Sequence, residues 1–279
     1  MIEIKNVSGT AFIIAQYRAD GSKDTTPLYH DEIVKLFLTN ETKKIAEDAA
    51  KNFPAAKEMV KIRTKYFDDT LSKEILQGCK QVVILGSGLD TRPARKNTPG
   101  VKYFEIENET TLKFKEEILN ANGIAADVSY IPGDYIKDNL IALLDRHHFN
   151  FNLSTYFIWE GNSSYLTEAE INIVLKQLRE NVVEFKISFD YMSDQVITRT
   201  TGYSDMDDYM NKLEQMGAIW KSGFANIEQL ANQVNLKVVD NFSTAELQQE
   251  YFPHPSLKSN IFRFYFLCTL EKYCESKST

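Results

Sequence analysis

The segment 82–91 constrains the fold of this chain more than any other part of it. The apolar, β-favouring run Val82–Leu85 leads directly into a turn that contains Gly86 and Gly88. Pro93 follows soon after, where a proline favours the first turn of a helix. A strand, a glycine turn and a helix in this order present backbone N–H groups to a nucleotide-like ligand at the edge of an α/β sheet. The segment therefore predicts an α/β nucleotide-binding fold.

The turn departs from the dinucleotide-binding pattern G-x-G-x-x-G in two ways. Thr91 occupies the position of the third glycine, and Asp90 adds a carboxylate to the loop. A pyrophosphate is negatively charged and is disfavoured beside Asp90, whereas a zwitterion that carries a sulfonium tolerates a nearby carboxylate. The turn therefore favours S-adenosylmethionine over NAD, with Gly86, Gly88 and Asp90 as predicted cofactor-binding residues.

A second acid indicates nucleoside binding. The run 101–106 predicts the second strand, and Glu107 follows it, nineteen residues after Gly88. This spacing is typical of an acid at the tip of the second strand that binds the ribose hydroxyls. Because NAD and S-adenosylmethionine share that contact, Glu107 indicates a nucleoside without identifying the cofactor.

The hydrophobic pattern predicts strands that alternate with helices over most of the chain. The expected strands are 81–85, 101–106, 127–131, 151–159, 182–191, 236–241 and 261–270. The expected helices include 31–38, 58–67, 108–122, 137–146, a helix capped by Thr167, and 227–235. The segment 243–259 is predicted as a loop with a short helical stretch at most. Without a crossover helix there, the last strand should run antiparallel to the others.

The predicted fold class is therefore α/β: a Rossmann-like, doubly wound, mostly parallel seven-stranded sheet with an antiparallel last strand and an N-terminal helical lid. We expect a single domain over residues 1–279. Within it, 1–76 would form the helical lid, with residues 1 to about 30 closing over the acceptor site. The cofactor-binding core would span 77–192, a helical insertion 193–224, and the strands that complete the sheet 225–279.

Charge and composition exclude several classes of function. The net charge of −7 disfavours a nucleic-acid surface, which needs clustered Lys and Arg. No apolar run is long enough to span a bilayer, and the first five residues carry no apolar signal core, so we expect a cytoplasmic protein. Three widely spaced cysteines and four histidines form neither a disulfide framework nor a metal-binding pattern, and no metal is expected.

Five blocks of residues, taken together and in order, resemble the leucine carboxyl methyltransferase-like group of class I S-adenosylmethionine-dependent methyltransferases, which includes bacterial polyketide O-methyltransferases. One block is the glycine turn itself, which extends to Arg92. Glutamate stands at 107 where the family usually has aspartate, and the proline that often follows is absent. Asn162-Ser163-Ser164 is also more polar than the family's usual stretch. The blocks are Thr10-Ala11 with Tyr17-Arg18-Ala19, 62–69, 86–92, 103–107, and Glu160-Gly161 with Tyr165-Leu166-Thr167.

The resemblance implies a role for particular residues of this chain. Arg63 would hold a carboxylate, and Glu107 would bind the ribose. Asp134 would contact the adenine amino group, and Glu160 would face the methionyl amine or the sulfonium. Arg63 and Tyr165 are also the expected catalytic residues, because they would orient the substrate or the cofactor.

The expected reaction is in-line methyl transfer from S-adenosylmethionine to a small-molecule carboxylate or hydroxyl acceptor. A carboxylate is already ionised at neutral pH, whereas a phenol benefits from a general base. The matched blocks contain no histidine, which favours a carboxylate or an acidic hydroxyl. Two alternatives remain open, an NAD(P)-dependent reductase and a catalytically inactive S-adenosylmethionine-binding protein. The sequence also leaves the oligomeric state open, and a monomer is one of the alternatives.

Overall fold

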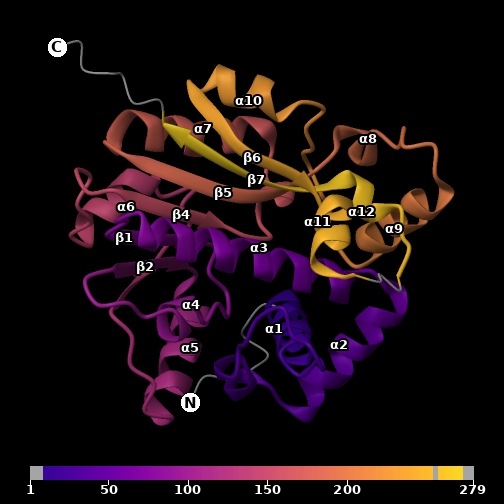
Figure 1. Cartoon of the computed structure of the whole chain (residues 1–279), viewed down its shortest axis with the longest axis horizontal. Coiled ribbons are helices and arrows are strands. Elements are labelled where there is room, and N and C mark those ends of the chain that lie inside the picture. The colour runs from indigo at the N-terminus through magenta and orange to yellow at the C-terminus, as the bar shows by residue number, and fades with distance from the viewer. Residues whose placement is uncertain (1–8, 254–256, 273–279) are drawn as a thin grey trace.

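The computed structural model describes residues 9–253 and 257–272, and part of the expected lid, residues 1–8, lies outside this range. A seven-stranded sheet with the strand order β3-β2-β1-β4-β5-β7-β6 crosses the molecule (Figure 1). Neighbouring strands from β3 to β5 are parallel, whereas β7 is antiparallel to both β5 and β6. The predicted fold class is therefore confirmed. The strands are β1 (Gln81–Leu85), β2 (Lys102–Glu107), β3 (Val128–Pro132), β4 (Thr155–Trp159), β5 (Phe185–Met192), β6 (Leu236–Ser243) and β7 (Tyr265–Lys272).

Helices cover both faces of the sheet, which explains why the central strands are continuous apolar runs. All five residues of β1 are buried. Val83 and Leu85 pack with the helices of one face, whereas Val82 and Ile84 pack with those of the other. The first face is covered by α6 (Leu140–Arg146), α7 (Glu168–Asn181) and α10 (Ile227–Gln233), and the second by α3 (Ala56–Leu76), α9 (Ser204–Gln215), α11 (Thr244–Tyr251) and α12 (Ile261–Phe264).

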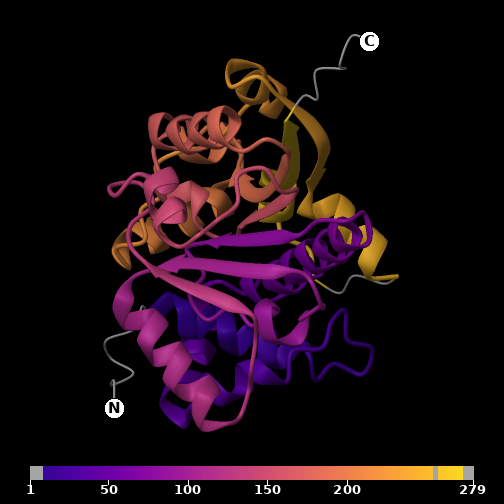
Figure 2. The same cartoon turned by 90° about the vertical axis from the view of Figure 1, so that its left-hand side faces the viewer.

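The N-terminal elements form a separate layer beyond α3, and the indigo helices lie below the sheet in both views (Figures 1 and 2). This layer contains α1 (Gly9–Gly21), the 3₁₀ helix η2 (Ile33–Phe37) and α2 (Asn40–Asn52). Phe12 of α1 and Phe37 of η2 both pack against Phe114 of α5 (Glu109–Ala121). The layer is thus joined to the sheet through α5, next to the turn that follows β1.

Local sequence signals located several helix ends correctly. Pro93 lies in the first turn of α4 (Arg92–Arg95), as expected. Thr167 and Glu170 form a complete capping box at the start of α7. Gly123, with φ of +68°, follows the end of α5, where a left-handed residue terminates a helix.

The segment 243–259 contains the short helix α11, which agrees with the expected short helical stretch, and a capping box of Ser243 and Glu246 starts it. Other expected boundaries were wrong. Residues 261–264 form a helical turn instead of the start of β7, because the Arg263 amide donates to Asn260 O at 2.9 Å and closes a turn. The periodic run 31–38 forms only the 3₁₀ helix η2, because the Asp31 side chain accepts from the Val34 amide and starts a tight turn.

The two central strands also begin later than expected. β4 starts at Thr155 because 151–153 form a turn, in which Leu153 N–H donates to Asn150 O. β5 starts at Phe185 because Val182 is the C-cap of α7. The expected insertion at 193–224 is helical in part, with α8 (Asp194–Ile197) and α9.

Candidate functional site

A cavity of about 380 Å³ opens at the carboxyl ends of the parallel strands. The carboxyl ends of parallel strands meet at one edge of a sheet, so residues far apart in sequence converge there. The polar part of the cavity wall comes from the residues that follow β1 and β4, from the ends of β2 and β5, from Arg63 on α3 and from the start of β7. The apolar part comes from α1, α3 and α9. The glycine turn and the polar side chains at this part of the wall include Arg63, Gly86, Gly88, Asp90, Glu107, Glu160, Asn162, Asp190 and Tyr265.

The glycine turn has the backbone conformation that glycine favours. Gly86 and Gly88 have φ values of +64° and +48°. A Cβ atom on Gly86 would lie only 2.6 Å from the Asn162 amide nitrogen. That amide group donates to the carbonyl oxygens of Gly86 and Glu160, at 3.2 and 2.8 Å. Asn162 therefore joins the glycine turn to the segment after β4. In the sequence, Asn162 was noted only because it is more polar than the family pattern, and this contact was not predicted.

Glu107 lies beside the glycine turn, as the spacing predicted. Its Oε2 atom accepts from the Gly88 amide at 2.9 Å, and Oε1 accepts from the Asn108 amide, also at 2.9 Å. Glu107 is partly exposed and lines the cavity. These amides therefore hold the carboxylate at the cavity wall beside the glycine turn, and the ribose contact itself stays a prediction.

Arg63 is buried at the floor of the cavity and contacts several polar groups at once. Its Nε atom donates to Glu160 at 2.9 Å, and Nη1 donates to the Tyr265 hydroxyl at 2.9 Å and lies 3.5 Å from Asp190. Arg63 and Glu160, to which the resemblance assigned separate roles, are therefore direct neighbours. Because Glu160 already occupies part of the guanidinium, a ligand carboxylate would have to share Arg63 with it.

Asp190 and Tyr265 belong to the site, and the sequence analysis missed both. Asp190 accepts from the Gly161 amide at 2.6 Å and from the Tyr265 hydroxyl. Burial raises the pKa of Asp190 by more than the Arg63 guanidinium lowers it. The only signal in the sequence was one acid inside the apolar strand 185–192. Tyr265 gave none, since an aromatic residue at the start of a strand is ordinary.

Asp90 lines the cavity, but its charge is compensated. Arg92 is fully buried and pairs with Asp90, with Asp68 at 2.8 Å and with Glu160 at 2.7 Å. Burial would raise the pKa values of Asp90 and Glu160, yet the neighbouring arginines, Arg92 first, hold both below their usual range. Because Arg92 compensates its charge, Asp90 would repel a pyrophosphate much less than its sequence position suggested.

The two remaining predicted residues lie in different surroundings. Tyr165, in the 3₁₀ helix η3 (Ser163–Tyr165), lines the cavity with its side chain 37% exposed. Asp134 follows β3 but is not among the described residues that line the cavity. Its carboxylate accepts from the Ile136 amide and lies 3.0 Å from Lys137 Nζ. The cavity does not bring Asp134 together with the other candidates, and the adenine contact stays a prediction.

The other half of the cavity is apolar and aromatic. It is enclosed by α1, the start of α3, α9 and the segment that follows α9. Trp220 and Tyr209 have ring centroids 5.8 Å apart, and Phe53 packs edge-on against Tyr209. The residues of this apolar chamber are Ile13, Ile14, Tyr17, Phe53, Ala56, Met59, Val60, Tyr209, Leu213, Met216, Ala218 and Trp220.

Neither metal binding nor membrane insertion has a structural indication in the described part of the chain. Within residues 9–253 and 257–272, no three His, Cys, Asp or Glu side chains are grouped so that they could hold a metal ion. None of the helices in these ranges is both long and apolar enough to cross a membrane.

Comparison with known proteins adds independent findings. Residues 11–179, more than half of the chain, match the sequence model of a family described as leucine carboxyl methyltransferase. Two curated relatives share the name "Putative S-adenosyl-L-methionine-dependent methyltransferase". One, from Mycobacteroides abscessus, is 26% identical over 76% of this chain and 73% of that protein. The other, YktD of Bacillus subtilis, is 29% identical over 89% of this chain and 92% of that protein.

The fold has a counterpart among solved structures. A crystal structure titled as a "putative methyltransferase" from Thermobifida fusca YX superposes with a TM-score of 0.62 and covers 95% of this chain and 94% of that chain. The two sequences are 16% identical, so this likeness concerns the fold alone.

Proposed function

Because the chain belongs to the leucine carboxyl methyltransferase family and is an S-adenosylmethionine-dependent methyltransferase, we propose that it methylates an oxygen atom of a small acceptor with an apolar body. The observation that carries this proposal is the continuity of one cavity. The glycine turn and the carboxylates line the same cavity as the residues of the apolar chamber. Because the chain belongs to this methyltransferase family, the alternative of an NAD(P)-dependent reductase has no support.

The residues at the polar end fit the cofactor chemically. The glycine turn lets a ligand approach the backbone closely, and Glu107 offers a carboxylate to hydroxyl donors beside it. Glu160 offers a second carboxylate for an ammonium or a sulfonium, and Arg63 offers guanidinium nitrogens for a carboxylate. When bound, S-adenosylmethionine supplies an activated methyl group on a sulfonium sulfur.

The acceptor should arrive as an anion, because the described residues that line the cavity offer no free base. None of the described residues that line it is a histidine. Asp90, Glu160 and Asp190 already accept from arginine or tyrosine donors, and Glu107 accepts from backbone amides. Burial raises the pKa of Tyr209, which keeps that hydroxyl protonated. These groups can orient an acceptor oxygen, but none of them is free to take its proton. A carboxylate or an acidic hydroxyl would therefore have to lose its proton before it binds.

In the proposed reaction an oxygen lone pair of the acceptor forms the new bond to the methyl carbon as the bond from carbon to sulfur breaks. The protein's contribution is alignment and exclusion of water. The apolar chamber would desolvate the acceptor, and Arg63 and Tyr165 would orient the reactants at the junction of the two halves. A carboxylate yields a methyl ester, and a phenolate yields a methyl ether.

Methyl transfer from labelled S-adenosylmethionine tests the proposal. The acceptor panel should contain aliphatic and aromatic monocarboxylates, phenols of graded acidity, and a peptide with a free C-terminus. Treatment of the product with mild base distinguishes the classes, because a methyl ester releases methanol and an ether does not. Cofactor binding without transfer to any member would instead support the inactive binding protein.

A blocked chamber provides a matched control. Ala56 lines the chamber at the start of α3, so Ala56→Trp should abolish transfer and leave cofactor affinity within about threefold. Ala121 is exposed at the end of α5, so Ala121→Trp makes the same change away from the cavity and should alter neither quantity. Full transfer by Ala56→Trp would place the acceptor site elsewhere.

A further inference from the structure

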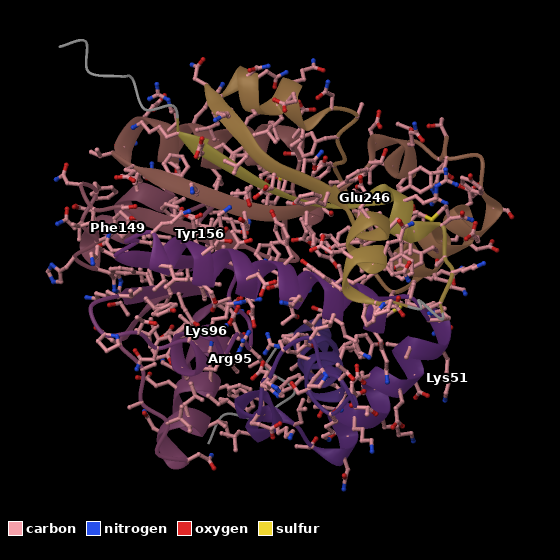
Figure 3. All side chains as sticks on the ribbon, viewed as in Figure 1. Lys51, Arg95, Lys96, Phe149, Tyr156 and Glu246 are labelled. Atoms are coloured by element: carbon pink, nitrogen blue, oxygen red, sulfur yellow. The ribbon has the colours of Figure 1, made fainter. Side chains whose placement is uncertain are left out.

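The cavity is bordered by a buried network in which carboxylates outnumber guanidiniums. Each ion pair shares a residue with the next, from Arg18 at one end to Asp190 at the other. Figure 3 labels Arg95, which lies on the far side of α3 from β7 in that view and pairs with both Asp68 and Asp31. Among the described residues, the network contains five carboxylates and four guanidiniums: Asp31, Asp68, Asp90, Glu160 and Asp190, with Arg18, Arg63, Arg92 and Arg95.

Asp190 is the carboxylate of this network that is least compensated. Its nearest guanidinium nitrogen, Nη1 of Arg63, is 3.5 Å away, whereas Glu160 has Arg63 at 2.9 Å and Arg92 at 2.7 Å. Within the described ranges, the remaining donors to the Asp190 carboxylate are the Gly161 amide and the Tyr265 hydroxyl. Such neutral donors stabilise a carboxylate by hydrogen bonding without cancelling its charge. Asp190 is only 3% exposed, so water screens that charge weakly.

The position of Asp190 places this charge at the acceptor side of the cofactor site. The sheet order puts β2, β1, β4 and β5 side by side. Glu107 ends β2, the glycine turn follows β1, Glu160 follows β4, and Asp190 lies near the end of β5. If the ribose binds Glu107 and the methionyl part reaches Glu160, the next of these residues along the edge is Asp190, which lines the same cavity as the apolar chamber.

Methyl transfer changes the charge of the ligand in this part of the site. S-adenosylmethionine carries a sulfonium, an ammonium and a carboxylate, a net charge of +1, whereas its demethylated product has a neutral sulfur and no net charge. We propose that Asp190 makes the site distinguish the two by charge, so that the sulfonium form binds more tightly than the spent thioether. This inference rests on the proposed function, because it requires the cofactor to occupy the cavity in the stated direction.

The proposal gives Asp190 the role of a specificity residue. A buried excess carboxylate is unfavourable in the empty site, and a cation relieves it. The same burial raises the pKa of Asp190, because it disfavours the ionised carboxylate relative to the protonated one. After transfer this relief is lost, so release of the product is favoured at the end of each cycle. The enzyme should accordingly show weak product inhibition.

Calorimetry with three ligands tests the proposal on the full chain: S-adenosylmethionine, S-adenosylhomocysteine, and sinefungin, in which a protonated amine replaces the sulfonium. The wild-type protein should bind both cationic ligands at least about fivefold more tightly than S-adenosylhomocysteine. In Asp190→Asn, affinity for the cationic ligands should fall roughly tenfold, the scale of one lost charge–charge interaction, and affinity for S-adenosylhomocysteine should change by less than about threefold.

Two variants separate charge from structure. Tyr265→Phe removes the hydrogen bonds to Asp190 and Arg63 but no charge at neutral pH, so it should change the affinities for all three ligands in parallel. Asp208→Asn removes the same charge from an exposed position on α9 and should change none of them.

Three results would overturn the proposal. The first is that the wild-type protein binds S-adenosylhomocysteine as tightly as sinefungin. This measurement does not depend on whether any variant folds. The second is an Asp190→Asn variant that weakens all three ligands equally. The third is failure of all three ligands to bind, which would remove the proposed function as well. Tight binding of S-adenosylmethionine without discrimination would overturn this inference alone.

Discussion

The Oε2 atom of Glu107 accepts a hydrogen bond from the Gly88 amide at 2.9 Å, which joins the end of β2 to the turn after β1. The two residues that the sequence linked only by a spacing of nineteen are therefore direct neighbours. A carboxylate held in this way is oriented before a ligand arrives, so less conformational entropy is lost on binding.

The first prediction concerns Glu107→Ala. We expect the dissociation constant for S-adenosylmethionine to rise roughly tenfold to hundredfold, because charge-assisted hydrogen bonds of about 1.5–3 kcal/mol to the ribose would be lost. Calorimetry measures the constant, and thermal unfolding checks that the variant is folded. An unchanged constant in a folded variant would mean that Glu107 only caps the glycine turn.

The second prediction concerns Gly86 and Asn162. Gly86→Ala would strain a backbone with φ of +64° and place a methyl group 2.6 Å from the Asn162 side chain. We expect Gly86→Ala to destabilise the protein by about 1–3 kcal/mol. Adding Asn162→Ala removes the clash but not the backbone strain, so the double variant should be less destabilised than the sum of the two single changes. Urea unfolding of all three variants measures this coupling, and simple additivity would argue against it.

The fold could be predicted from sequence because its signals are local. The glycine turn, the alternation of strands and helices, and the capping box at Thr167 each lie within a few residues of the element that they define. The site was predicted only in part, because its missing members meet through the fold. Tyr265 contacts Arg63 across 202 positions, and Asn162 contacts Gly86 across 76. No local pattern marks such residues, since what matters is the strand order that brings them together.

The third prediction concerns acid stability. Burial would raise the pKa values of Asp68, Asp90 and Glu160, but the neighbouring arginines lower them further, to below their usual range. These depressed values make a contribution to stability that is complete above the unfolded-state values of about 4 and is lost as the pH falls through the lower folded-state values. Unfolding at a series of pH values should therefore show a steep loss of stability below about pH 4.

Arg92→Met provides the contrast. This substitution removes the guanidinium that pairs with three buried carboxylates, those of Asp68, Asp90 and Glu160. It should lower the free energy of unfolding by about 3–5 kcal/mol at pH 7. Protonation of the stranded acids then relieves the folded state, so the variant should regain part of this loss between pH 7 and pH 5. Arg146→Met, at an exposed position, should behave as the wild type. A constant difference between Arg92→Met and wild type at every pH would contradict this explanation.

The fourth prediction concerns Tyr165. Its hydroxyl group makes no hydrogen bond to the described residues, and its side chain is 37% exposed at the cavity. Tyr165→Phe should therefore leave the free energy of unfolding within about 0.5 kcal/mol of wild type. If the hydroxyl orients a reactant, kcat/KM should fall about tenfold, the loss of one hydrogen bond. An unchanged kcat/KM would assign Tyr165 to the cavity wall alone.

The last prediction concerns the N-terminal layer as a lid. Helix α1 supplies Thr10, Ile14 and Arg18 to the cavity wall, and Arg18 donates to the Leu89 carbonyl in the glycine turn. A ligand that orders the glycine turn should therefore also order α1. Closure of this layer would exclude water, which competes with the acceptor for the methyl group.

Hydrogen exchange, with and without cofactor and an acceptor analogue, measures this coupling. Amides of residues 9–30 should become more protected when both ligands bind, whereas those of α7, on the opposite side of the sheet, should not change. Arg18→Met would remove the hydrogen bond to Leu89. It should therefore reduce the ligand-induced protection of α1, and the protection of α7 should stay as in the wild type. Equally high protection of α1 with and without ligands would instead make it a fixed layer, and the acceptor would then have to enter past α9, where Met216 is exposed at the cavity.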